Sequence, residues 1–138
     1  MEAEAATAAS LLRLLEVAAL VGERTAVVQL LGWLGPLAGL YEPLEGVTVG
    51  RIMGEGAVLL GEYEAARQYY AQGQAVAAKL EHRPELALLQ LDLAELGASE
   101  GHVEAAQEHL AFCIPELEAM KMRPALERAR ALRSQLGG

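Results

Sequence analysis

The sequence repeats itself about every 40 residues, and this feature constrains the fold most because such periods mark repeat architectures. Residues 61–66 (GEYEAA) recur as residues 101–106 (GHVEAA), and a weaker copy begins at Gly22. The register continues along a helically spaced apolar stripe, in which Tyr63, Ala66, Tyr70, Gly73, Ala77 and Leu80 correspond to Val103, Ala106, Leu110, Cys113, Leu117 and Met120. We therefore predict three copies of one helical repeat.

Each repeat is predicted to be a helix pair, because another apolar stripe precedes each glycine turn. These leading stripes are Leu11, Leu14, Ala18 and Val21; Val49, Met53, Gly54 and Ala57; and Leu86, Leu89, Leu93 and Leu96. Gly22, Gly61 and Gly101 suit the left-handed position after a helix, and Pro84 and Pro124 suit first helical turns. We predict seven helices, at residues 3–21, 25–41, 48–60, 63–80, 84–99, 102–120 and 123–136, with one loop at 42–47.

Composition supports an all-α fold. Alanine and leucine supply 26 and 25 of the 138 residues, whereas there are two isoleucines, three threonines and no asparagine. The length suits one domain, residues 1–138, made of repeats at about 8–47, 48–83 and 84–122. We predict a right-handed superhelical stack of three antiparallel helix pairs, closed by a capping helix at 123–136.

Charge and hydropathy exclude several classes of function. The net charge is −8, with an acidic body and a basic C-terminal segment that lacks aromatic stacking partners, so we predict no nucleic-acid binding. The charge-free run at 25–41 is broken by three glycines and Pro36, which argues against a membrane span. An acidic N-terminus and a single cysteine favour a cytoplasmic location.

Three residues of the second repeat carry a family resemblance. Gly54, Ala66 and Tyr70 resemble the small, small and aromatic signature of the tetratricopeptide repeat. The sequence departs from that pattern at Gly50, where the family has an aromatic residue, and at Ala57, where it has tyrosine. The period is also longer than the usual 34 residues.

The longer second helices look like the repeats in the C-terminal regions of maltose-regulon-activator-type regulators and of bacterial proteins that join a cyclase to a signalling ATPase. Residues 60–66 (LGEYEAA) and 120–126 (MKMRPAL) are similar to phrases common there. This resemblance implies a scaffold or sensor surface in a bacterial signalling or transcription regulator, with no inherited catalytic residue.

The reactive side chains form no catalytic or metal-binding pattern. His102 and His109 lie about 10.5 Å apart along a helix axis, too far for one metal ion. Cys113 falls on an inward stripe and has no basic neighbour to lower its pKa, so we interpret it as a packing residue. Phosphate-binding and nucleophile motifs are missing from the sequence. We therefore predict no enzyme activity, no cofactor and no metal.

A charged row on the first helices is the candidate site. In stacked helix pairs these helices line the concave side. The row comprises Glu16, Glu55 and Glu95 in equivalent positions, with Arg13, Arg51 and Asp92 a turn away. It predicts a protein-interaction module for a basic or amphipathic peptide segment; the alternative for the row itself is an ordinary solvated helix face. Two other functions stay open, a self-assembly unit forming a homodimer and a sensor of a small-molecule effector.

Overall fold

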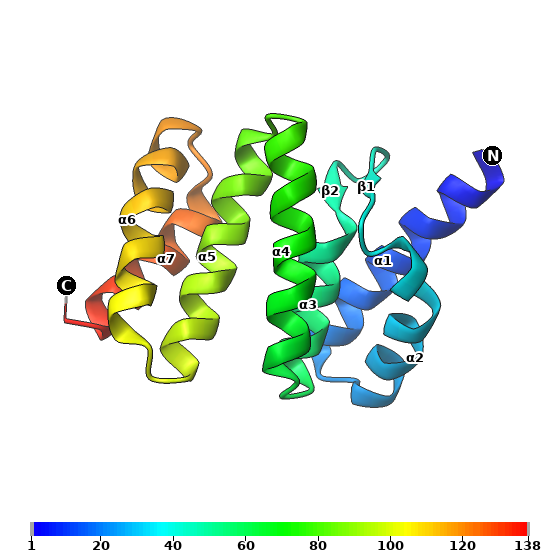
Figure 1. The fold of residues 1–138 in the computed structure, drawn as a ribbon, viewed down its shortest axis with the longest axis horizontal. Helices are drawn as coiled ribbons and strands as arrows, with labels where there is room; N and C mark the ends of the chain where they lie inside the picture. The colour runs from blue at the N-terminus through cyan, green and yellow to red at the C-terminus, as the bar shows by residue number, and fades with distance from the viewer. Residues whose placement is uncertain (1, 138) are drawn as a thin grey trace. The chain divides into compact units, whose positions relative to one another are not determined.

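Seven α-helices dominate the computed structural model, which describes residues 2–137 and the side chains of residues 7–137 (Figure 1). The helices are α1 (Glu2–Val21), α2 (Arg24–Leu34), α3 (Val49–Leu59), α4 (Tyr63–Lys79), α5 (Arg83–Ser99), α6 (Val103–Ala119) and α7 (Arg123–Gln135). The prediction of an all-α fold is confirmed. None of the described helices is both long and apolar enough to cross a membrane.

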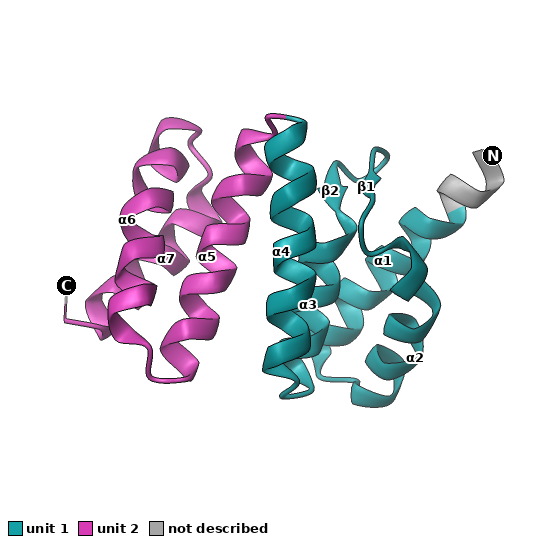
Figure 2. Cartoon of the chain, viewed as in Figure 1, with its two compact units in different colours: residues 1–80 teal, residues 81–138 magenta. Residues whose placement is uncertain are grey.

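The chain divides into two compact units, residues 1–80 and residues 81–138 (Figure 2). Unit 1 holds α1 to α4, and unit 2 holds α5 to α7. Within unit 1, α1 packs against α2, α3 packs against α4, and α3 also contacts both α1 and α2. Within unit 2, α6 packs against α5, and α7 packs against both. The predicted single domain and superhelical stack stay predictions.

The helix ends repeat with the predicted period. Helices α4 and α6 span 63–79 and 103–119, and α5 and α7 begin at 83 and 123. Gly22, Gly61 and Gly101 have φ values of 78°, 76° and 82°, which confirms the left-handed glycine turns. The turns after α4 and α6 place Glu81 and Lys121 in the same region. One turn geometry therefore recurs even where glycine is missing.

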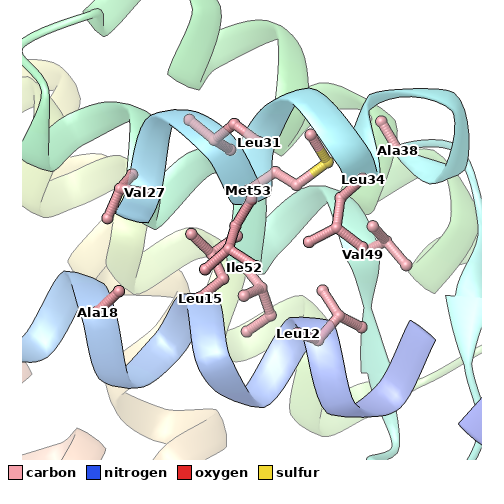
Figure 3. Close-up of a cluster of buried hydrophobic side chains, with 11 residues drawn as sticks. Leu12, Leu15, Ala18, Val27, Leu31, Leu34, Ala38, Val49, Ile52 and Met53 are labelled. Carbon is pink, nitrogen blue, oxygen red and sulfur yellow. The ribbon is translucent and has the colours of Figure 1, made fainter. Parts of the chain in front are cut away.

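The core of unit 1 lies between α1, α2 and α3 (Figure 3). Its buried side chains include Leu12, Leu15, Ala18, Val27, Leu31, Leu34, Val49, Ile52 and Met53. The predicted leading stripe on α1 is wrong at Leu14 and Val21, which are 56% and 64% exposed. Apolar residues cover most of the circumference of α1, so their spacing does not select a face. The contacts with α2 and α3 select the face that carries Leu12 and Leu15.

The second predicted helix is also too long. Helix α2 ends at Leu34, since Pro36 has no N–H to continue it, and a 3₁₀ turn (Gly35–Leu37) follows. The chain then forms a short antiparallel hairpin of β1 (Tyr41–Glu42) and β2 (Val47–Thr48). The predicted loop at 42–47 is thus part of a hairpin whose turn includes Gly46, with φ +70°.

Small residues bring α3 and α4 together. A Cβ atom on Gly50 would lie within 3.0 Å of the Tyr69 carbonyl oxygen and the Gly73 backbone nitrogen. A Cβ on Gly54 would overlap the ring of Tyr70. The backbones of α3 and α4 therefore leave no room for a side chain at Gly50.

Unit 2 has its own core. Buried side chains come from α5, α6 and α7, and include Ala87, Leu91, Ala94, Ala106, Leu110, Cys113, Leu117, Ala125, Leu126 and Ala129. A bidentate ion pair joins the start of α5 to α6, with Arg83 Nε and Nη2 each 2.8 Å from a carboxylate oxygen of Glu116. This pair lowers the pKa of Glu116 and raises that of Arg83, chiefly through the side-chain hydrogen bonds.

Candidate functional site

In unit 1, the predicted charged row is partly occupied by ion pairs within the chain. Arg13 is exposed on α1 and its Nε lies 3.5 Å from Glu45 Oε1 in the hairpin turn. On α3, the Nη1 of buried Arg51 lies 3.4 Å from Glu55 Oε2. Glu16 is exposed on α1. The alignment of Glu16 and Glu55 with Glu95 would span both units, and it stays a prediction.

In unit 2, the two predicted acids are brought together by a residue that sequence reasoning did not include in the site. Arg128 of α7 places its Nη2 3.3 Å from Asp92 Oδ1 and 2.5 Å from Glu95 Oε1. Asp92 is only 4% exposed. The signal in the sequence was the contrast between an acidic body and a basic last helix. Part of that contrast serves to attach α7 to α5 through ion pairs.

This arrangement predicts unequal roles for two arginines of α7. Replacing Arg128 with methionine should destabilise the protein by about 1–3 kcal/mol, because buried Asp92 loses a charged partner. Arg130→Met is the matched control, because Arg130 pairs with Glu118 where both side chains are about half exposed. It should cost less than about 1 kcal/mol. Urea unfolding measures both, and equal losses would contradict a structural role for the Arg128 cluster.

The cysteine and two of the histidines, His82 and His109, have surroundings that fit a structural role. Burial raises the pKa of Cys113 to about 11, which leaves it a protonated thiol at neutral pH. His82 Nδ1 accepts a hydrogen bond from the Glu85 N–H at 3.2 Å and so caps α5. His109 Nδ1 lies 2.5 Å from Gln90 Oε1, and burial lowers the pKa of His109. The described residues hold no group of three or more side chains suited to a metal ion.

A small hollow lies on unit 2 between α6 and α7. It measures about 210 Å³ and is lined by Gln107, Leu110, Ala111 and Arg133. Pockets that enclose a drug-sized ligand usually measure about 300–1,000 Å³. The hollow is smaller than this, and the small-molecule sensor stays a prediction.

Large apolar side chains are exposed mainly near the start of the chain. Of the eleven large hydrophobic residues that are exposed among the described side chains, eight lie between residues 14 and 44; we group these eight by their place in the sequence and call them the N-terminal apolar surface. They are Leu14, Val17, Leu20, Val21, Val28, Trp33, Leu40 and Leu44. Trp33, the only tryptophan, is 62% exposed. Three of the eight, Val28, Trp33 and Leu40, lie in the charge-free run at residues 25–41.

Sequence reasoning missed the N-terminal apolar surface because it assigned Leu14 and Val21 to the core. A signal was present in the doublets Leu11-Leu12 and Leu14-Leu15, which place leucine on two sides of one helix. When such a helix packs against neighbouring helices on one side only, the leucines on its other side stay exposed.

Comparison with known proteins found no similar protein. No family model, no curated protein and no solved structure matches the chain. The resemblance to long-helix tetratricopeptide repeats is thus a prediction from the residues alone.

Proposed function

We propose that the chain is a non-catalytic protein-interaction module that binds its partner through the N-terminal apolar surface. The observation that carries this proposal is the concentration of exposed large apolar side chains within residues 14–44. Exposed apolar side chains that lie together mark interaction sites, and the four on α1 share one side of that helix. Tryptophan is also enriched among the residues that dominate binding energy, and Trp33 is positioned to act in this way.

The charged row is a weaker candidate for the binding surface. Arg51 and Glu55 pair with each other, and Asp92 and Glu95 pair with Arg128. A ligand of opposite charge would have to compete with these ion pairs. The N-terminal apolar surface needs no such exchange, because its gain on binding is the removal of apolar area from water, about 25 cal/mol per Å².

The two candidate surfaces differ in their response to salt. Binding of a basic segment to the charged row would weaken as ionic strength rises, since salt screens exposed charges. Binding through the apolar surface should change little. We extend the proposal to a cytoplasmic scaffold or sensor region of a bacterial regulator, a context that rests on the sequence resemblance.

Site-specific photo-crosslinking tests the proposal. A benzophenone amino acid at position 33 should yield a covalent adduct with a protein in the native host. The same amino acid at position 112 should yield none. Phe112 is a matched control because it is an aromatic residue of unit 2 that is 49% exposed. The proposal fails if position 33 gives no adduct, or if positions 33 and 112 give the same one.

A further inference from the structure

Helix α1 carries an uncovered apolar stripe, formed by Leu14, Val17, Leu20 and Val21. Their exposed fractions are 56%, 56%, 86% and 64%. The four residues follow spacings of three and four along one side of the helix, and Leu12 and Leu15 point from the other side into the core. The stripe is therefore a second apolar face on a helix that already has a buried one.

The same face exists on α3, where it is covered. Gly22 and Gly61 end the two helices with the same left-handed turn, so a shift of 39 residues relates α1 to α3. The stripe then corresponds to Met53, Gly56, Leu59 and Leu60.

The α3 equivalents of the stripe pack against the first helix pair. Met53 is fully buried, and Leu59 and Leu60 contact the same core cluster. A Cβ on Gly56 would lie 3.1 Å from Leu15 and 3.3 Å from Val27. On α3 this side of the helix is therefore covered by a pair of helices, α1 and α2. The equivalent side of α1 is uncovered.

The exposed apolar side chains of α2 correspond to polar residues on α4. The 39-residue shift relates Val28 and Trp33 of α2 to Arg67 and Gln72 of α4. Arg67 forms an ion pair with Glu64 there, at 3.6 Å. Helix α4 thus has a polar outer surface where α2 has an exposed valine and tryptophan.

We propose that a second copy of this chain covers the stripe, so that two copies pair through α1 about a twofold axis. This inference rests on the proposed function and names its partner. In such an interface the same patch meets itself, and charge at its centre would repel its own copy. The stripe has no charged residue, although the chain carries a net charge of −8.

Charged residues beside the stripe include Arg13, Arg24 and the exposed Glu16. Arg13 pairs with Glu45, and Arg24 donates hydrogen bonds to the carbonyl oxygens of Leu59 and Leu60, at 2.8 and 3.3 Å. Both cations are thus engaged within unit 1. A neutral apolar face fits another neutral apolar face better than it fits a basic peptide.

A head-to-tail arrangement fits less well. It would place the stripe against a different surface of the second copy. In a stack of helical repeats, that surface would be the exposed side of α7. That side carries Glu127 and Arg130, both exposed. Covering the stripe with α7 would desolvate those charges, and the four apolar side chains of the stripe offer them no partner.

Sedimentation velocity of the full chain tests the inference. The wild-type protein should change from monomer to dimer as its concentration rises. Val17→Glu should weaken the dimer at least tenfold, because two buried carboxylates would face each other near the twofold axis. Phe112→Glu introduces the same charge at an exposed apolar position of unit 2 and should leave the dimer intact. Circular dichroism should show both variants folded.

A disulfide test locates the contact. Val17→Cys should form a covalent dimer on mild oxidation, whereas Phe112→Cys should not. The natural thiol does not interfere, because Cys113 is buried.

A wild-type chain that remains monomeric, or a dimer that persists in Val17→Glu, would overturn self-pairing through α1. The proposed function has a separate outcome. If position 33 crosslinks to another protein while the chain stays monomeric, the interaction module stands with a different partner. If the chain stays monomeric and position 33 also gives no adduct, the proposed function fails as well.

Discussion

Removing residues 122–138 should unfold unit 2 or reduce its stability by on the order of 5 kcal/mol. Helix α7 buries Ala125, Leu126 and Ala129 against α5 and α6, and Leu132 and Leu136 pack at the edge of the same cluster. A buried leucine alone contributes about 1.5–3 kcal/mol, and whole domains are stable by only about 5–15 kcal/mol. The deletion also removes Arg128 from buried Asp92.

Thermal unfolding followed by far-ultraviolet circular dichroism, together with light scattering, measures this effect. We expect a lower or missing transition and aggregation through the newly exposed side chains of α6. A truncated chain as stable as the parent would show that α7 does not complete the core.

Point variants keep the deletion test interpretable if the truncated chain does not fold. Leu126→Ala should cost about 2–5 kcal/mol, as for other buried leucines. The neighbouring change Glu127→Ala alters an exposed residue and should shift stability by less than about 0.5 kcal/mol. Similar melting temperatures for the two variants would contradict the orientation of α7.

Replacing Gly50 with alanine should destabilise unit 1 by about 3 kcal/mol or more. Overpacking commonly costs about 1–3 kcal/mol when flexible side chains can move aside. At Gly50 the obstructing atoms belong to the backbone of α4, at Tyr69 and Gly73, so α3 and α4 must separate. Chemical denaturation of the full chain measures the loss.

Gly32→Ala is the matched control for this substitution. Gly32 also lies within a helix, but a Cβ there meets nothing within 4 Å. Alanine should therefore stabilise α2 by up to about 1 kcal/mol through its higher helix propensity. A loss at Gly32 equal to that at Gly50 would show that crowding between α3 and α4 is not the cause.

The sequence predicted part of the candidate site and none of the N-terminal apolar surface. It placed Asp92 near Glu95, because residues three apart share a helix face, and both acids contact Arg128 in the structure; their part in a binding face stays a prediction. It could not supply Arg128, which lies 36 residues after Asp92 and is brought to it by the packing of α7 on α5. The exposure of Leu14 and Val21 was likewise hidden, since each belongs to an apolar pattern that suits burial equally well.

The sequence by itself determined the helices and the turns between them. Helical spacing, the glycines at 22, 61 and 101, and the prolines at 84 and 124 act within one or two turns of chain, so they carry their information locally. Tertiary structure decided which side of α1 enters the core, where α2 gives way to a hairpin, and which acids Arg128 holds. These outcomes depend on contacts between segments far apart in sequence, and a helix with apolar residues on two sides has no local reason to prefer one.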